Sequence, residues 1–126
     1  MSRSEAPSRV THGDAGGPEG GDAVRVVLVT APDEETGVRV ARDLVGCRLA
    51  ACVNLVTSTR SVYRWEDEVK DEEEVLLLIK TRSDQCDALS RRIHEIHPYD
   101  VPEVLVLPAV GGSAAYLDWV RAESSP

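Results

Sequence analysis

Apolar and polar residues change their spacing several times along this chain, and each change predicts a boundary between secondary-structure elements. Residues 24–30 (VRVVLVT) are rich in β-branched side chains and predict a first strand. Asp33 is a good N-cap residue, and the apolar positions after it follow helical spacing as far as about Arg48, with Gly46 as an alternative end of the helix. Pro32 lies between the strand and the helix, where its missing N–H is tolerated.

The middle of the chain predicts a long β-hairpin followed by a helix. Residues 51–65 form a long β-like stretch, residues 66–71 form an acidic turn, and residues 72–82 form the returning strand. Helical spacing resumes at Ser83 and stops before Pro98, because proline cannot continue a helix.

Two short elements complete the predicted domain, which we assign to residues 24–123. Residues 104–107 predict a fourth strand, and a terminal helix begins at Ser113. The order βαββαβ plus a helix indicates an α+β fold of the ferredoxin-like type, with two helices on one face of a four-stranded antiparallel sheet. Residues 1–23 hold five of the nine glycines and few large apolar side chains, so they are predicted to be a disordered leader.

The predicted strands are apolar on both faces, which a single subunit of this size does not explain. An antiparallel sheet covered on one face normally alternates apolar and polar residues, but residues 26–29, 75–79 and 104–107 are apolar at successive positions. The second face is therefore predicted to pack against another copy of the chain. Residues 51–65 would also extend about 50 Å as one strand, beyond their own core. The alternative is a monomer whose hairpin bends in the polar segment 57–61.

Composition limits the partners and the compartment. The chain of 126 residues has 22 acidic and 14 basic side chains and a net charge of −8, which disfavours nucleic acid and anionic membranes as partners. Its three cysteines argue against a disulfide framework and for a reducing, cytoplasmic location. No apolar run approaches the ~20 residues that a membrane-spanning helix needs.

Six motifs resemble those of the CutA divalent-ion tolerance family, in order and with the same spacing, from about Val24 to Val120. They are TAPDE (30–34), LAACVN (49–54), SVYRWE (61–66), EV with IKT (74–75 and 79–81), HPY with VPE (97–99 and 101–103) and YLDW (116–119). The resemblance implies a cytoplasmic homotrimer of ferredoxin-like subunits, similar in architecture to PII signal proteins and associated with tolerance to copper and other divalent ions. The number of three subunits comes from this resemblance alone.

Cysteine and histidine provide the candidate metal ligands. Cys52 is the cysteine of the LAACVN motif, and a thiolate is a soft ligand for Cu(I) or Zn(II), although a lone strand cysteine is more often a small buried apolar residue. His97 ends the second helix, where it either caps the last carbonyls or binds a metal. His94, three residues earlier, can join it together with Glu95 or an acid from another subunit.

The chain departs from part of the family at this site. Some members that are similar in having a copper site carry a cysteine and a second histidine where this chain has Val29 and Ile96. A site of that design is weak or absent here unless His94 or Cys52 substitutes. Cys86 and Cys47 are predicted to be structural, in the apolar stripe of the second helix and at the end of the first.

The remaining polar features point away from an enzyme. The chain has no P-loop, GxSxG, HExxH or CxxC motif, and a Cys52–His97 nucleophile pair is the minor alternative. The seven acids within residues 66–74 predict a solvated hairpin end, and Tyr63 and Trp65 share one strand face that suits an interface.

These features together predict a non-enzymatic homotrimer that binds divalent metal ions, chiefly copper, with no obligatory cofactor. The alternative is a PII-like signalling or scaffold trimer that takes a small molecule or a partner protein at clefts between subunits.

Overall fold

The computed structural model describes residues 20–126, so the disorder predicted for residues 1–19 lies outside the described residues. Residues 20–23, which the sequence placed in the leader, form a turn. The N–H of Ser83 donates to the carbonyl of Ala23, and the N–H of Asp84 donates to the carbonyl of Gly21. This turn therefore ties the start of the domain to the segment that precedes the second helix.

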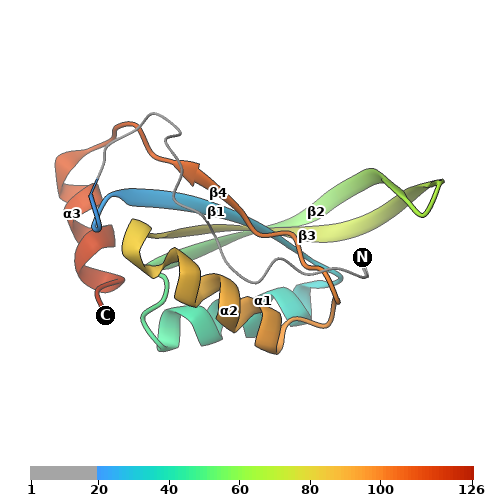
Figure 1. Ribbon diagram of the computed structural model, residues 1–126, viewed down its shortest axis with the longest axis horizontal. Coiled ribbons are helices and arrows are strands. Elements are labelled where there is room, and N and C mark those ends of the chain that lie inside the picture. Colours follow the sequence, from blue (N-terminus) through green and yellow to red (C-terminus); the bar gives the residue numbers. More distant parts are fainter. Residues whose placement is uncertain (1–19) are drawn as a thin grey trace.

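The elements follow one another in the predicted order. They are β1 (Val24–Ala31), α1 (Glu34–Gly46), β2 (Cys52–Trp65), β3 (Glu68–Arg82), the 3₁₀ turn η1 (Ser83–Gln85), α2 (Cys86–Ile96), β4 (Leu105–Pro108) and α3 (Ala114–Glu123). The strands form one antiparallel sheet in the order β2-β3-β1-β4. Helices α1 and α2 both lie on one side of this sheet, below it in Figure 1, while α3 lies at its end. The predicted α+β arrangement is confirmed.

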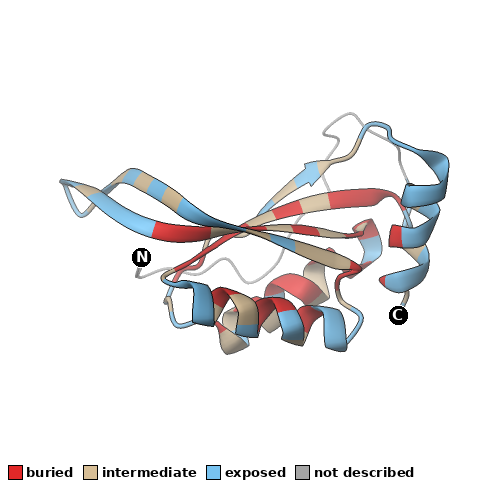
Figure 2. Cartoon of the chain, turned by 180° about the vertical axis from the view of Figure 1, so that it is seen from behind, coloured by how far each residue is buried: buried red, intermediate tan, exposed pale blue. Residues whose placement is uncertain are grey.

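The main core lies between the sheet and the helices α1 and α2. Alternate residues of β1 and β3 meet apolar residues of both helices there, and the red segments in Figure 2 show where these surfaces face each other. The buried members are Val27, Val29, Ala31, Val40, Leu44, Ala50, Val75, Leu77, Ile79, Cys86, Leu89 and Ile93. Burying side chains of this size is worth about 1.5–3 kcal/mol each, so this cluster is the largest source of stability in the subunit.

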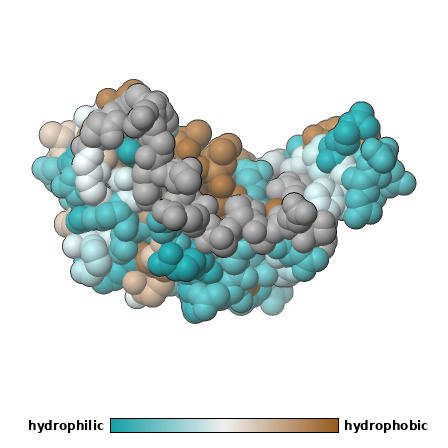
Figure 3. All heavy atoms as spheres, in the orientation of Figure 1, coloured by the Kyte–Doolittle hydropathy of each residue, from teal (hydrophilic) through white to brown (hydrophobic). Residues whose placement is uncertain are grey.

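The opposite side of the sheet, which we call the outer face, is also apolar. Register places Val26 opposite Leu107 and Leu28 opposite Leu105, and Leu76 and Leu78 share the same side. Leu105 and Leu107 are 52% and 40% exposed. Figure 3 shows apolar side chains gathered in the hollow between the hairpin and the α3 end. Among residues 20–126, neither α1 nor α2 contacts this face.

The hairpin turn is shorter than the sequence indicated. Only Glu66 and Asp67 form it, with φ values of 50° and 63°, and β3 already begins at Glu68 instead of Glu72. Two left-handed residues are typical of a type I′ turn, whose twist matches the strands beside it. The acids that follow remain in the ladder because cross-strand and same-strand cations neutralise some of them, as Arg60 does for Asp71 at 2.8 Å.

A bulge in β2 changes which of its side chains reach the outer face. Val56 pairs with Leu76 but Thr59 pairs with Glu74, so β2 contains one extra residue there. Tyr63 and Trp65 consequently lie on the outer face. The hairpin still extends well past the helices in Figure 1, as predicted for an arm longer than its own core.

Helix α1 ends at Gly46, the earlier of the two predicted ends, and Arg48 just beyond it adopts a left-handed φ of 64°. Two further boundaries differ from the prediction by a few residues. Helix α2 begins only after the 3₁₀ turn. Strand β4 includes Pro108, whose missing N–H is harmless on an edge strand. Within the described part of the chain, none of the helices combines the length and apolar character needed to cross a bilayer.

Candidate functional site

His97 is buried and has a partner on each ring nitrogen. Its backbone N–H closes α2 on the carbonyl of Ile93, so the predicted capping position is confirmed. The ring does not bond the last helix carbonyls, however, and this part of the capping prediction is wrong. Nε2 lies 2.8 Å from the carbonyl of Thr30, and the N–H of Tyr99 donates to Nδ1 at 3.1 Å. Because a carbonyl only accepts, Nε2 carries the proton.

The arrangement around His97 favours the neutral ring. Burial lowers the pKa of His97 below its usual value, and the carbonyl of Thr30 opposes this effect. Protonation of Nδ1 would bring two N–H groups together at Tyr99. His97 therefore joins the end of α2 to β1, and a metal ion would have to displace one of its two hydrogen bonds.

A pH-dependent contribution to stability follows from this environment. The unfolded chain binds the His97 proton more tightly than the folded chain, so stability is expected to fall as the pH drops below about 6.5, toward the folded-state pKa. His97→Gln removes the titrating group and keeps an N–H donor, so urea denaturation of this variant should depend less on pH in that range. Equal pH dependence in wild type and His97→Gln would contradict this role.

The loop after α2 is fixed by a second contact. The hydroxyl of Tyr99 donates to Oε2 of Glu74 at 2.8 Å, and the Tyr99 ring lies 4.6 Å from the His97 ring. Burial, followed by the Glu74 carboxylate, raises the pKa of Tyr99 above its usual range. The sequence predicted Glu74 to belong to a solvated hairpin end, and this is wrong for Glu74, which is 3% exposed because the loop after α2 covers it. Sequence analysis gave Tyr99 no role beyond its place in a motif that resembles a known family.

His94 offers the second candidate imidazole. Its Nδ1 lies 2.8 Å from the carbonyl of Ser90 one helical turn earlier, so this nitrogen donates. Its Nε2 is buried and has no hydrogen-bond partner among the described residues. Glu95, proposed as an additional ligand, is exposed on the same helix.

Cys52 lies at a different part of the sheet from His97. Cys52 pairs with Lys80, which pairs with Val26 of β1, whereas His97 contacts Thr30 four residues further along β1. That separation is about 13 Å along the strand. The structure therefore does not bring Cys52 and His97 together as a nucleophile pair. Across residues 20–126, no three His, Cys, Asp or Glu side chains are grouped in a way that could hold a metal ion.

The immediate surroundings of Cys52 are polar and partly open. Its thiol is 3.8 Å from Oδ1 of Asn54, which also accepts from the Lys80 ammonium. Tyr116 of α3 is a neighbour as well. Burial, and then the adjacent Cys52 thiol, raises the pKa of Tyr116. Sequence analysis missed this contact, because 64 residues separate its partners and no local pattern marks it.

The other two cysteines take the structural positions predicted for them. Cys86 is fully buried in the main core, and burial raises the pKa of its thiol to about 12. Cys47 is exposed at the C-cap of α1. Val29 and Ile96, the two positions where the sequence analysis expected ligands to be missing, pack in or against the core.

Comparison with known proteins identifies the family. Residues 25–123 match the family described as CutA1 divalent ion tolerance protein. The chain belongs to this family. The CutA1 match covers both candidate histidines, Cys52 and all of the described helices and strands except the first residue of β1.

Individual CutA relatives agree with this assignment. The "Divalent-cation tolerance protein CutA" of Thermus thermophilus is 48% identical over 96 residues, which cover 76% of this chain and 93% of the relative. The rice "Protein CutA 1, chloroplastic" is also 48% identical, but the match covers 54% of its length. The crystal structure of CutA1 from Oryza sativa has a TM-score of 0.79 at 45% identity, covering 81% of this chain and 94% of that chain.

Proposed function

We propose that this chain acts in divalent-ion tolerance as a non-enzymatic homotrimer of ferredoxin-like subunits that binds copper. Membership of the CutA1 divalent ion tolerance family carries the proposal. The net charge of −8 is compatible with cations as ligands and disfavours nucleic acid and anionic membranes. A cytoplasmic location remains a prediction, since one related structure is described as periplasmic and two plant relatives as chloroplastic.

The outer face supports assembly of several copies. Leu105, Leu107 and Val56 are 52%, 40% and 44% exposed, and all three lie on this face. Soluble monomers rarely leave a contiguous apolar surface of this kind exposed. Strand β2 is also a 14-residue edge strand, and unpaired edges of this length favour pairing with another chain. A second and a third copy would cover both features.

Cys52 is the strongest copper ligand that the chain offers. Its thiol is partly exposed, whereas Cys86 is enclosed in the core. Thiolates are soft donors that suit Cu(I). His94 also offers Nε2, which has no partner among the described residues, but α2 lies on the other side of the sheet from Cys52. His97 remains a predicted ligand, but it binds only if Tyr99 or Thr30 releases its ring.

Calorimetric titration with Cu(I), kept reduced by excess ascorbate, tests these ligands. Cys52→Ser is expected to weaken binding by at least tenfold, because a hydroxyl is a poor donor for a soft ion. His94→Ala and His97→Ala measure the imidazole contributions, and Cys47→Ser is the control for an exposed thiol elsewhere. An isotherm identical to wild type for Cys52→Ser would remove Cys52 from the copper site, and the absence of Cu(I) binding by the wild-type protein would contradict the copper proposal.

Thermal-shift measurements separate this function from a PII-like role. Ligands that bind only the folded state raise its melting temperature. Copper or zinc should therefore raise it, and nucleotides should not. A nucleotide shift with no metal response would instead favour a signalling trimer.

A further inference from the structure

Helix α3 has less apolar contact with the rest of the chain than the other two helices. It belongs to a small separate cluster that consists of Val24, Ala51 and Val120, with Ala109 and Leu117 packed against it. Val120 is the buried apolar residue that α3 supplies, whereas α1 and α2 each supply several to the main core. Apolar burial alone therefore holds α3 weakly.

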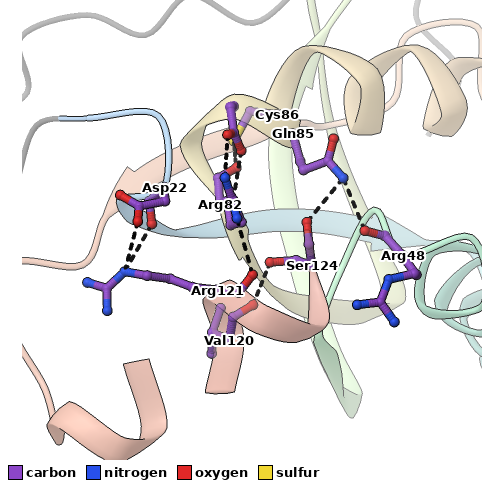
Figure 4. Close-up of polar contacts among 9 residues, drawn as sticks. Asp22, Arg48, Arg82, Gln85, Cys86, Val120, Arg121 and Ser124 are labelled. Carbon is purple, nitrogen blue, oxygen red and sulfur yellow. Dashed lines mark hydrogen bonds and ion pairs between the residues drawn. The ribbon is translucent and has the colours of Figure 1, made fainter. Parts of the chain in front are cut away.

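Polar contacts from Arg48 provide part of the remaining attachment. The Arg48 guanidinium donates to the carbonyl of Ala122 at 2.8 Å and to that of Ser125 at 3.3 Å, so it caps the C-terminal end of α3. Figure 4 shows Arg48 beside the end of this helix. A cation at this position also interacts favourably with the negative end of the helix dipole.

Gln85 connects the same two segments from the inside. It is 7% exposed, and its Nε2 donates to the carbonyl of Arg48 at 3.2 Å and to that of Ser124 at 3.1 Å (Figure 4). We call the contacts of Arg48 and Gln85 with α3 and the residues just after it the polar clamp. Arg121 adds a further bond to the carbonyl of Asp22 at 3.2 Å at the other side of the helix.

The contacts of the polar clamp can break while the rest of the domain stays folded. The side chain of Arg48 is 55% exposed, and exposed charged contacts contribute little net stability because water competes for them. Segments with few buried apolar contacts and many exposed hydrogen bonds separate from a domain more readily than its core unfolds. Helix α3 meets the first condition, and the Arg48 bonds of the polar clamp meet the second, whereas the bond from Gln85 to the carbonyl of Ser124 is buried.

Opening of α3 would expose the Cys52 thiol further. Helix α3 packs through Val120 against Ala51, the residue before Cys52, and Tyr116 on its first turn interacts with the Cys52 side chain. The Tyr116 ring lies 5.7 Å from the Trp119 ring, so an aromatic pair moves with the helix. Cys52 itself is on β2, which the main core holds in place through Val53 and Leu55.

We propose that α3 is a strap that controls access to the Cys52 thiol, and that the polar clamp sets how often it opens. Soft metal ions and small electrophiles are the reactants whose access it limits. Closing the strap places Tyr116 against the thiol, and opening it exposes the thiol without unfolding the domain.

Alkylation by iodoacetamide tests the strap, because the three cysteines of the full chain report on three different events. Cys47 is exposed and should react fastest, and Cys86 is fully buried and should react only on global unfolding. Cys52 should react at an intermediate rate. Peptide mass spectrometry resolves the three rates in one sample.

Two variants weaken the clamp, and each is expected to accelerate alkylation of Cys52 about tenfold while Cys86 stays at its wild-type rate. Arg48→Gly removes the guanidinium and suits the left-handed backbone at this position, so a rate change reports loss of the contact and not strain. Gln85→Ala removes the inner bonds. Arg91→Ala, an exposed arginine of α2, is the matched control and should change neither rate.

Two results would contradict the proposal that α3 controls access to the Cys52 thiol. Cys52 and Cys86 could accelerate together in the clamp variants, which would mean that α3 leaves only when the whole domain unfolds. Cys52 could also keep one rate in all the variants, which would mean that α3 does not limit access. Iodoacetamide acts with no metal present, so these outcomes are independent of the copper titration.

Discussion

Leu107→Asp is expected to convert the proposed trimer into separate subunits at micromolar concentration. Leu107 lies on the outer face, 40% exposed, beside Val26 of β1. A carboxylate buried there between copies would lose its hydration without gaining a partner, which costs several kcal/mol in each subunit. Size-exclusion chromatography with light scattering should change from about three times the subunit mass of 13.7 kDa to that mass itself.

Val45→Asp provides the control for Leu107→Asp. Val45 is 42% exposed, nearly the same as Leu107, but it lies on α1 at the other side of the sheet. This variant should keep the wild-type mass. A wild-type protein that elutes as a single subunit, or equal masses for the two variants, would remove the outer face as the assembly surface.

Leu77→Ala is expected to cost about 2–5 kcal/mol of stability, the range for truncation of a fully buried leucine. Leu77 is fully buried and lies so close to α1 that a Cβ added at Gly37 would come within 3.5 Å of it. The space left by truncation cannot close easily, because the helix backbone already approaches the sheet there. Urea denaturation measures the loss, which should be the same at every protein concentration.

Leu78→Ala separates core packing from assembly within the same strand. Leu78 is the next residue of β3 and points to the outer face, where it is partly exposed. Its truncation should cost most at high protein concentration, where the copies are assembled, and less on dilution to separate subunits, because the assembly contribution that it weakens is then absent. A Leu78→Ala loss that is the same in assembled and dissociated samples, as for Leu77→Ala, would show that the outer face takes no part in assembly.

The order of helices and strands could be predicted because local patterns encode it. The β-branched run of β1 has one partner strand on each side, and Asp33 caps α1 as predicted, with its Oδ1 accepting from the N–H of Thr36 at 2.8 Å. That bond also lowers the pKa of Asp33. These features depend on residues within a few positions of each other, which is the range that sequence periodicity reports.

The details of the hairpin arm could not be predicted in the same way. The two-residue turn and the bulge after Val56 are set by how β2 pairs with β3, and the polar residues on both strands are compatible with more than one register. From the sequence alone, a run of acidic residues predicts a solvent-exposed loop. In the paired strands, Arg60 and Lys70 form ion pairs with acidic side chains, which reduces the repulsion among the acids and permits strand structure there.

At the candidate site, too, only the features that depend on neighbouring residues in the sequence could be predicted. The structural positions of Cys47 and Cys86 followed from helix periodicity, and both are confirmed. The bond of His97 to Thr30 joins residues 67 positions apart, and the contact of Cys52 with Tyr116 joins two distant elements. Such contacts arise from the packing of α2 and α3 against the sheet, so no local spacing contains them.

The extra residue in β2 has a consequence for any comparison or redesign of the arm. Removing Ser58 would restore one-to-one pairing with β3 but leave Thr59 opposite Glu74, so Tyr63 and Trp65 would keep their present side. If the full β2 sequence paired one-to-one with β3 beyond Val56, Val62 and Arg64 would occupy that side instead. The single extra residue therefore decides that the aromatic side of the arm, and not its aliphatic and basic side, continues the outer face.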